Sequence, residues 1–274
     1  MFDNSEKIVN DAYNRMDLSN QFWNRYQQRE VDFILSKLHG RTIQNVLDFG
    51  CGNGRHAIEF AGRGYETWGI DYSERNIQQA VAESKVSNVH FVKDDCRTVS
   101  LGIQADLALC LYDVIGSFIH VEDNQAILKN IWRHLRNGGC LAMSVMNLEL
   151  TRAIAINQVP NVRKNLMALA SLRPGKIMQN SGDIFKQEYF LLETETGIVY
   201  RKEQFENEGD LCAEYAIRDK RYSRDEICGL LEKVGFRILE TRYVQAGKWE
   251  KPLTAVDPSA KEILIFAEKV SFHS

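Results

Sequence analysis

The sequence predicts an α/β fold built on a doubly wound, mostly parallel sheet of seven strands with a C-terminal antiparallel hairpin strand. Between residues 40 and 147, short apolar runs alternate with helical stretches of about ten residues, which is typical of βαβ units with helices on both faces of a sheet. After residue 147 the rhythm changes to runs typical of antiparallel strands. We therefore expect a parent sheet that carries an inserted antiparallel β lid.

The first part of the chain should supply most of the parent sheet. Continuous apolar runs predict strands over 44–49, 65–70, 89–92, 105–111 and 140–147. Helical periodicity predicts helices over 54–63, 73–84 and 124–136, the last ended by Asn137, Gly138 and Gly139. The alternation of these elements places neighbouring strands parallel to one another.

The second part should hold the insertion and the end of the parent sheet. We expect an interrupted helix over 148–172, then antiparallel strands over 184–192, 198–206 and 211–218. Ser223 and Glu226 form a capping-box pattern at the start of a helix over 223–234, and strands over 236–244 and 262–270 follow. The chain then divides into an N-terminal helical cover (1–39), a parent domain (40–147 and 222–274) and a lid over the substrate (148–221).

Composition and charge favour a soluble, cytoplasmic protein. The net charge of −3 over 274 residues gives no excess of Lys and Arg, so we expect no nucleic acid and no membrane as partner. The six cysteines are scattered, without a Cys-x-x-Cys pair or a His cluster, so we expect reduced thiols and no metal site. The sequence shows no signal peptide and no apolar stretch of the roughly 20 residues that span a bilayer. The sequence does not decide between a monomer and a homodimer.

The most informative motif lies at the end of the first predicted strand. Asp48 ends that strand, and Gly50, Gly52 and Gly54 then alternate into the start of a helix. Glycines allow a tight turn here and let a ligand lie against the main chain. Asp71 ends the next strand, where a carboxylate can accept hydrogen bonds from two ribose hydroxyls. The pattern predicts a nucleoside-containing ligand.

The spacing of the glycines argues against a dinucleotide. The dinucleotide pattern G-x-G-x-x-G requires a glycine where this chain has Arg55. A carboxylate at Asp48 would gain nothing from a pyrophosphate, whereas a ligand with an ammonium and a sulfonium would be attracted to it. The alternative interpretation is structural: Asp48 caps the helix and the glycines form only a turn.

The motif resembles the first motif of class I S-adenosylmethionine-dependent methyltransferases, over roughly 20–147 and again at 221–270. Ile70-Asp71-Tyr72-Ser73 resembles the second motif, and Lys93-Asp94-Asp95-Cys96 lies where that family contacts adenine. The resemblance implies a Rossmann-like fold, S-adenosylmethionine as cofactor and methyl transfer. It implies the following cofactor-binding residues: Asp48, Gly50, Cys51, Gly52, Gly54, Arg55, Asp71, Tyr72, Asp95, Cys96, Leu111, Arg25 and Tyr26.

Within that family the chain looks most similar to small-molecule N-methyltransferases of the glycine/sarcosine and amino-sugar kind. The shared features are 110–120 after the fourth strand, Asn147 after the fifth, and Arg25 with Tyr26 in the N-terminal segment. Arg25 could bind the methionine carboxylate of the cofactor bidentately, although Arg15, Arg29 and Arg55 compete for this role.

Methyl transfer from a sulfonium is an in-line displacement, so alignment of the reacting atoms and exclusion of water matter most. A base helps where the nucleophile must lose a proton. The candidates for a base or an orienting group are Tyr112, Asp113, His120, Asn147 and Tyr222. Four of them have a structural alternative: an aromatic cover for Tyr112, a loop position for His120, a core position for Asn147, and a solvated charged face around Tyr222.

The acceptor is expected to be a small molecule with a nitrogen, oxygen or carbon nucleophile. After the fourth strand the chain reads Leu111-Tyr112-Asp113-Val114, without the prolines that nucleic-acid amino-methyltransferases carry there or the Pro-Cys of cytosine-C5 enzymes. An RNA-modifying methyltransferase is the second interpretation, and a methyltransferase with a lipid or quinone-type acceptor is the third. A protein that binds S-adenosylmethionine without methyl transfer, or a NAD-dependent oxidoreductase, remains as an alternative of a different class.

Overall fold

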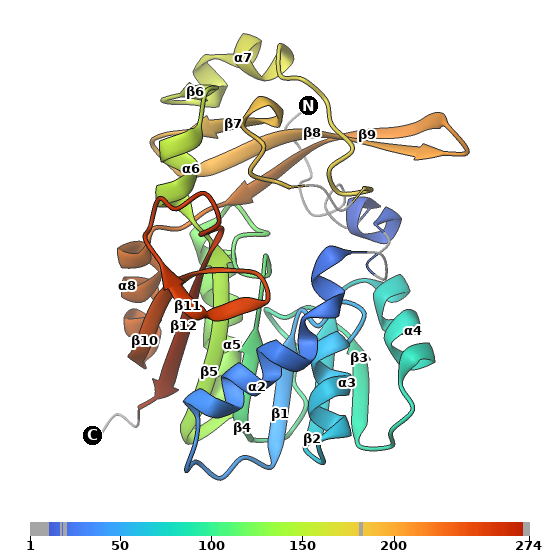
Figure 1. Cartoon of the computed structure of the whole chain (residues 1–274), viewed down its shortest axis with the longest axis vertical. Helices are drawn as coiled ribbons and strands as arrows, with labels where there is room; N and C mark the ends of the chain where they lie inside the picture. The colour runs from blue at the N-terminus through green and yellow to red at the C-terminus, as the bar shows by residue number, and fades with distance from the viewer. Residues whose placement is uncertain (1–10, 17, 19–20, 181–182, 271–274) are drawn as a thin grey trace.

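Two β-sheets organise the chain, and one lies above the other (Figure 1). The computed structural model describes residues 11–16, 18, 21–180 and 183–270. Within this part, the larger sheet holds eight strands in the order β11 (Lys248–Leu253), β10 (Phe236–Gln245), β12 (Glu262–Lys269), β5 (Leu135–Met146), β4 (Ala105–Cys110), β1 (Asn45–Phe49), β2 (Glu66–Asp71) and β3 (Val89–Lys93).

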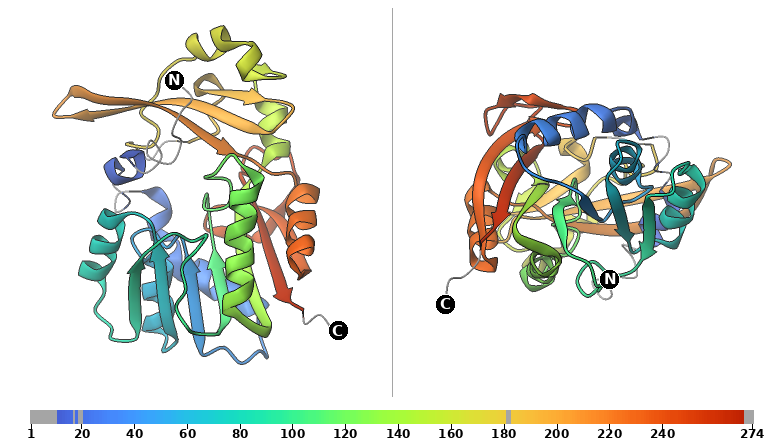
Figure 2. Two further views of the ribbon diagram at one scale, coloured as in Figure 1. Left: turned by 180° about the vertical axis from the view of Figure 1, so that it is seen from behind. Right: turned by 90° about the horizontal axis from the view of Figure 1, so that it is seen from below.

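The larger sheet confirms the predicted doubly wound α/β architecture. Strands β5, β4, β1, β2 and β3 are parallel neighbours, whereas β12, β10 and β11 pair antiparallel at the other side of the sheet. Helices α2 (Gln27–Lys37) and α3 (Arg55–Gly62) cover one face, and α5 (Val121–His134) and α8 (Arg224–Val234) cover the other (Figure 2). Helix α4 (Glu74–Glu83) connects β2 with β3.

Apolar side chains from both helical layers bury the sheet. On one face Leu128 and Leu231 pack with strand residues such as Leu47, and all three are fully buried. On the other face Ile34 of α2 and Phe60 of α3 form a second cluster. The continuous apolar runs of the central strands follow from this arrangement, because each strand is covered on both sides.

The observed elements differ from the predicted ones mainly at their ends. Helix α5 ends at His134, and β5 begins at Leu135, so Asn137-Gly138-Gly139 lies within the strand rather than after the helix. Strand β11 was not predicted and extends the sheet by one strand. The capping box of Ser223 and Glu226 is present at the start of α8.

The second sheet comes from the segment between β5 and α8. Its order is β6 (Gln158–Val159), β7 (Phe190–Glu193), β8 (Ile198–Asn207) and β9 (Asp210–Lys220). Strands β8 and β9 confirm the predicted antiparallel pair, whereas the strand expected from residue 184 begins only at Phe190. The predicted interrupted helix consists of α6 (Leu148–Ile154), α7 (Leu166–Ala170) and the short 3₁₀ helix η2 (Val162–Lys164) between them.

The two sheets are tied together where β9 returns to the parent fold. The backbone N–H of Lys220 donates to Gly116 O at 2.8 Å, and that of Tyr222 donates to Met146 O at 3.2 Å. In Figure 1, β8 and β9 extend over the upper ends of the central strands. The second sheet therefore lies above the edge where the parallel strands end.

The N-terminal segment lies beside the same edge. Residues 11–15 are helical, and the 3₁₀ helix η1 (Phe22–Arg25) leads into α2. Part of the predicted helical cover, residues 1–10, 17, 19 and 20, lies outside the described residues. Within the described part of the chain, no helix has the length and apolar character needed to cross a bilayer.

Candidate functional site

The glycine loop after β1 is fixed to the tip of β2. The backbone N–H groups of Gly50 and Cys51 both donate to Ile70 O, at 2.7 and 2.9 Å. Gly50 has φ of 73°, and a Cβ on it would lie 2.3 Å from Cγ2 of Val114. Only glycine fits this position, because any side chain would meet both an unfavourable backbone angle and a neighbouring side chain.

Asp71 holds the same loop from the end of β2. Its Oδ2 accepts the backbone N–H of Gly52 at 2.8 Å, and its Oδ1 accepts that of Ser73 at 2.9 Å. Burial raises the pKa of Asp71 even though these hydrogen bonds favour the carboxylate. The carboxyl group thus shapes the loop and remains part of a cavity wall above it.

A cavity of about 390 Å³ lies between the tips of the parallel strands and the second sheet. Its floor is the glycine loop and the segment after β4. Tyr13 and Trp23 of the N-terminal segment form one wall, and Ile177, Phe185 and Arg201 approach from the segment of the second sheet. The size is that of a small-molecule site, for which about 300–1,000 Å³ is usual.

Asp48 is a buried carboxyl group without a complete set of partners. Its side chain is 2% exposed and lines the cavity, and its Oδ2 meets no hydrogen-bond donor within the described part of the chain. Burial raises its pKa to about 7, although the nearby Arg55 opposes the shift. A ligand that brings positive charge to this position would relieve the cost of burying the carboxylate.

Glu30 of α2 is the centre of a buried polar cluster under the cavity. Its Oε2 accepts from Arg55 at 2.7 Å and contacts Nε2 of His56 at 2.8 Å. Its Oε1 accepts the phenolic O–H of Tyr112 at 2.5 Å and the backbone N–H of Gly247 at 3.0 Å. One carboxylate therefore joins α2, α3, the segment after β4 and the turn between β10 and β11.

The electrostatics of this cluster fix its protonation. Burial would raise the pKa of Glu30, but Arg55, His56 and Tyr112 outweigh it and lower the pKa to about 2. Burial and the neighbouring Arg55 lower the pKa of His56 to about 4, although Glu30 opposes this. At neutral pH the cluster is therefore an ionised Glu30–Arg55 pair beside a neutral imidazole.

Tyr112 has a constrained backbone directly after β4. Its φ of 67° lies in the left-handed region, which is unusual for a residue with a side chain. Its backbone N–H donates to Oγ of Ser144 at 2.6 Å, and that hydroxyl donates to Glu262 at 2.7 Å. Arg55 lies over its ring at 4.6 Å. Backbone, ring and hydroxyl are thus all held by neighbours.

Comparison with known proteins identifies this arrangement. The profile of the family described as "Methyltransferase domain" matches residues 46–139, which carry the glycine loop, Asp71 and Tyr112. Residues 46–139 thus match a methyltransferase domain, and solved structures of similar fold include S-adenosylmethionine-dependent methyltransferases. The cofactor of such domains is S-adenosylmethionine, and one solved neighbour of similar fold, a glycopeptide N-methyltransferase, is a complex with it.

Relatives of this methyltransferase domain are partial matches. A ubiquinone biosynthesis O-methyltransferase of Rickettsia canadensis (strain McKiel) is 28% identical over 123 residues, which are 43% of this chain and 50% of that protein. A tRNA 5-carboxymethoxyuridine methyltransferase of Escherichia coli (strain K12) is also 28% identical over 123 residues, 43% of this chain and 46% of that protein. The chain spans about half the length of the curated relatives it matches.

Similarity in fold extends over nearly the whole chain. The CcbJ methyltransferase from Streptomyces caelestis superposes with a TM-score of 0.68, covering 98% of this chain and 100% of that one at 13% identity. At such identity the likeness concerns the fold alone. It nevertheless includes the second sheet, because coverage of 98% leaves little of the chain outside the match.

Most of the predicted cofactor residues of the methyltransferase domain meet in the cavity wall. Those that line it are Asp48, Gly50, Cys51, Gly52, Arg55, Asp71, Tyr72, Asp95, Cys96 and Leu111, together with the catalytic candidates Tyr112 and Asp113. They come from the ends of β1, β2, β3 and β4, which lie side by side at one edge of the sheet. Their roles toward a cofactor stay predictions.

Gly54, Arg25 and Tyr26 do not line this cavity. A Cβ on Gly54 would lie 2.6 Å from the ring of Phe91, so this glycine allows close packing of α3 on the sheet. Arg25 is exposed, and its guanidinium lies 5.9 Å from the ring centre of Tyr26. The ring of Tyr26 instead packs against Gly247, where a Cβ would lie 2.2 Å from it.

The expectation that Asn147 faces the cleft is wrong. Its side chain is fully buried, and its Nδ2 donates to Ala255 O at 2.7 Å and to Ala260 O at 2.6 Å. Its Oδ1 accepts the backbone N–H of Leu150 at 3.2 Å, which caps helix α6. All of its polar atoms are used in holding the chain between β5 and α6.

His120 and Tyr222 also lie outside the cavity wall. His120 is the exposed residue before α5. Tyr222 is 2% exposed within the core beneath α5 and α8, and burial raises the pKa of its hydroxyl. Neither side chain is placed to reach a ligand above the glycine loop, so Tyr112 and Asp113 are the candidates that the structure brings to the cavity.

Asp95 is positioned by a neighbour that the sequence analysis did not consider. Nη2 and Nε of Arg97 donate to its Oδ2 at 2.6 and 3.0 Å, and both residues line the cavity. Burial opposes ionisation of Asp95, but these hydrogen bonds prevail and lower its pKa. Oxygens of an ionised Asp95 remain acceptors at the expected adenine end.

The main residues missed were Glu30, Glu262 and Arg201. Glu30 is the buried polar position of the amphipathic helix α2, which is the signal that could have found it. Glu262 begins the apolar strand β12 and is 2% exposed. Arg201 lies in β8 and reaches the cavity from the second sheet, and no local pattern indicates this.

Proposed function

We propose that the protein transfers a methyl group from S-adenosylmethionine to a small-molecule acceptor by in-line displacement. The observation that supports this most directly is one continuous cavity of about 390 Å³, whose wall includes the glycine loop at one end and Ile177, Phe185 and Arg201 at the other. A cofactor and a small acceptor could share such a space, with the residues after β4 between them.

The residues around the glycine loop fit the cofactor. Asp71 offers carboxylate oxygens to the ribose hydroxyls, and Asp48 offers an unpaired buried oxygen to the positive charge of the methionine part. We assign Asp95 and Cys96, which line the same cavity, to the adenine. Gly50 and Gly52 let the cofactor lie directly against the backbone.

Arg55 is our candidate partner for the carboxylate of the methionine part, in place of Arg25. Its Nη2 is buried and meets no hydrogen-bond acceptor within the described part of the chain, while its Nη1 is held by Glu30 and Trp23 O. A guanidinium with a free N–H in a cavity wall is suited to a carboxylate. Arg25 does not line the cavity.

The bound cofactor would supply the methyl group as an electrophile on a sulfonium. The chain's own part is alignment and exclusion of water. Tyr112 is fixed through its hydroxyl, its ring and its backbone N–H, so it forms a rigid surface between the two ends of the cavity. The segment of the second sheet covers the other side, which is the role that we propose for residues 148–221 as a lid.

An RNA acceptor is the second candidate, because one relative of similar identity is named as a tRNA methyltransferase. A quinone-type acceptor is supported in the same way by the ubiquinone biosynthesis relatives. Binding of S-adenosylmethionine without methyl transfer is the remaining alternative. The cytoplasm is the compartment we propose, since all six cysteines are free.

Two measurements test the proposal. Calorimetry should show binding of S-adenosylmethionine and S-adenosylhomocysteine and none of NAD; preference for NAD would overturn it. A labelled methyl donor offered with small amines, phenols and activated carbons, and separately with bulk tRNA, should give labelled small molecules. Label in tRNA alone would favour the second candidate, and cofactor binding without label in any acceptor would favour a binding protein.

A further inference from the structure

One carboxyl group at the acceptor end of the cavity has no counter-ion. Asp113 follows Tyr112 and lines the cavity. Its Oδ1 is buried and meets no hydrogen-bond donor, and no ion pair within the described part of the chain includes it. The charge of this group therefore depends on what else occupies the cavity.

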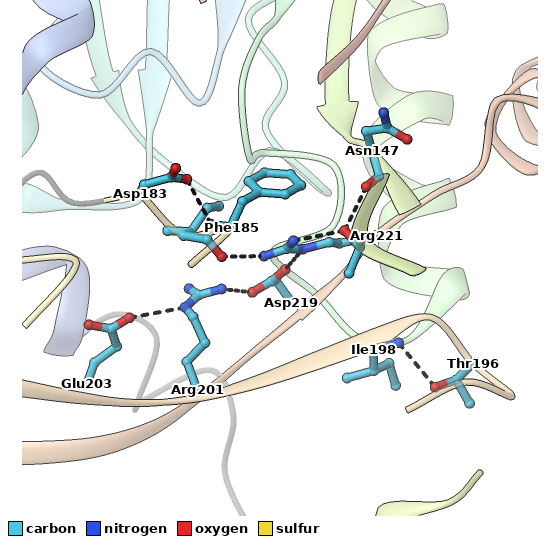
Figure 3. A network of polar contacts seen from close by, with 11 residues as sticks. Asn147, Asp183, Phe185, Thr196, Ile198, Arg201, Glu203, Asp219 and Arg221 are labelled. Carbon is cyan, nitrogen blue, oxygen red and sulfur yellow. Dashed lines mark hydrogen bonds and ion pairs between the residues drawn. The ribbon is translucent and has the colours of Figure 1, made fainter. Parts of the chain in front are cut away.

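The two arginines whose charges act on Asp113, Arg201 and Arg221, are already paired with other carboxylates. Arg201 donates through Nε to Glu203 at 3.1 Å and through Nη1 to Asp219, and Arg221 donates through Nε to the second oxygen of Asp219 at 3.1 Å. Figure 3 shows these side chains joined in one line. Two guanidinium groups thus face two carboxylates, and the network has no net charge left for Asp113.

Arg221 has further partners that fix it in place. Its Nη1 donates to Thr151 at 2.9 Å, its Nη2 donates to Ile184 O at 3.0 Å, and it lies 4.2 Å from the ring centre of Phe185 (Figure 3). It is fully buried. A side chain with so many contacts cannot turn toward Asp113 without leaving several of them unmade.

The other charges at this end do not supply the missing cation. Nζ of Lys261 is paired with Asp183 at 2.5 Å. Glu262 is 2% exposed and accepts from Ser144, and it adds a second acidic group beside Asp113. Burial raises the pKa of both Asp113 and Glu262 to about 7, and Asp219 adds to the shift at Asp113. The acceptor end of the cavity therefore has more carboxyl groups than cationic side chains to pair with them.

We propose, on the basis of the function above, that the acceptor nucleophile is an amine and that Asp113 binds it as an ammonium. A hydroxyl would offer one hydrogen bond but no charge, and a carboxylate or phosphate would be repelled. An ammonium supplies both the missing charge and N–H donors to the carboxylate of Asp113, which lines the cavity.

The same contact also prepares the nucleophile. The ammonium has no free electron pair, so one proton must first pass from nitrogen to the carboxylate of Asp113. The freed pair on nitrogen then forms the N–CH₃ bond while the C–S bond breaks and its electron pair stays on sulfur. The methylated amine leaves with its positive charge, and Asp113 returns its proton to water after release.

A cofactor analogue tests this without knowledge of the acceptor. In the amino analogue of S-adenosylhomocysteine, a CH–NH₃⁺ group replaces the sulfur, so its ammonium nitrogen occupies the position of the transferred methyl, next to the position proposed for the acceptor nitrogen. We expect calorimetry to show wild-type protein binding this analogue at least about tenfold more tightly than S-adenosylhomocysteine. Asp113→Asn should remove most of that preference while S-adenosylhomocysteine affinity stays within about threefold.

Glu149→Gln is the matched control. Glu149 also has a buried oxygen that meets no hydrogen-bond donor within the described part of the chain, but it does not line the cavity, so its loss should leave the preference for the amino analogue intact. If Asp113→Asn does not bind S-adenosylhomocysteine at all, Asp113→Ser is measured instead, with the same expectation. A preference that persists in the neutral variant, or is absent from wild type, overturns the amine assignment. Failure of wild type to bind S-adenosylhomocysteine would instead overturn the proposed function.

Discussion

Glu30 in helix α2 accepts the phenolic O–H of Tyr112 at 2.5 Å, although 82 positions separate them in the sequence. The same carboxylate accepts from Arg55 and from the backbone of Gly247. Helix α2 therefore supports the residues around the cavity and is not a separate cover. The positions of Tyr112 and Arg55 depend on the buried carboxylate of Glu30.

Replacement of Glu30 by Gln should disturb both stability and binding. The change leaves Arg55 buried without its counter-ion, and loss of one partner of a buried pair costs about 3–5 kcal/mol. We expect the free energy of unfolding in urea to fall by an amount of that order, and the affinity for S-adenosylhomocysteine to fall at least about tenfold because Arg55 is no longer held.

Glu250→Gln is the control for this variant. Glu250 pairs with Arg29 of the same helix, but both side chains are about half exposed. Exposed pairs contribute little, so stability and affinity should remain near wild type. Equal effects of the two substitutions would show that the buried cluster around Glu30 has no special role.

The fold could be predicted because its signals are local. Each central strand is an apolar run and each helix has a periodic face, so the order of elements follows from short windows of sequence. Strand β11 was missed for a physical reason. Lys248, Glu250 and Pro252 are typical of an exposed edge strand, and Trp249 is its one fully buried residue, so no apolar run marks it.

The candidate site likewise contains residues that a local sequence pattern indicates and residues that only the folded structure brings together. Asp48, the glycines and Asp71 belong to one strand–loop–helix–strand unit, and their spacing alone indicated a nucleoside site. Asn147 shows the limit, because a polar residue after an apolar strand can face a cleft or cap a helix, and only its contacts decide. Glu30 and Glu262 act through partners far away in the chain; the amphipathic pattern of α2 could indicate that Glu30 is buried, but not which residues either glutamate contacts.

Asp71→Ala should abolish tight cofactor binding. The variant loses the acceptor oxygens proposed for the ribose and also releases the backbone N–H groups of Gly52 and Ser73. Hydrogen bonds to a charged group are worth about 1.5–3 kcal/mol each, so calorimetry should show S-adenosylhomocysteine binding about a hundredfold more weakly.

Asp106→Ala separates loop stability from ribose binding. Asp106 also accepts two backbone N–H groups, those of Gln44 and Asn45, but at the opposite end of the strands. It should lower stability without changing affinity. Unchanged affinity in Asp71→Ala would refute the ribose assignment.

The carboxylate partner can be found with decarboxylated S-adenosylmethionine. Wild-type protein should bind it about tenfold or more weakly than S-adenosylmethionine, because Arg55 then has no carboxylate to bind. Arg55→Gln should bind both compounds with similar affinity, whereas Arg25→Gln should discriminate as wild type does. The reverse pattern would restore Arg25 to the role expected from the sequence.

Tyr112→Phe should lower turnover and spare the cofactor. The ring stays, but the backbone at φ of 67° loses the hydroxyl anchor to Glu30, and small misplacements of reacting groups can cost up to about a hundredfold in rate. We expect at least a tenfold loss in kcat, with S-adenosylhomocysteine affinity within about threefold of wild type. Tyr243→Phe is the control, since Tyr243 also donates to a glutamate, Glu149, outside the cavity wall. Equal losses in both variants would mean that the anchor does not act through the cavity.

The stability of the cofactor-free protein should depend on pH through Asp48. Burial raises the pKa of Asp48 to about 7, whereas an aspartate in an unfolded chain has a pKa of about 3.9. Between these values the folded state binds a proton that the unfolded state does not, so the free energy of unfolding falls as pH rises from about 4 to about 7. Above about pH 7 the loss of stability is complete, because the carboxyl group of Asp48 is then ionised in the folded protein as well as in the unfolded chain.

Asp48→Asn should therefore stabilise the cofactor-free protein at pH 8, by on the order of 2 kcal/mol in urea unfolding, and change it little at pH 4. Cofactor affinity should fall in the same variant, because the proposed partner of the positive charge is gone. Glu268→Gln provides the opposite sign: burial would raise the pKa of Glu268, but Arg237 and Arg41 lower it, so its loss should destabilise at pH 8. Destabilisation by Asp48→Asn at pH 8 would show that the carboxylate is already compensated within the protein, and the attraction of this site for a cationic ligand would then lose its physical basis.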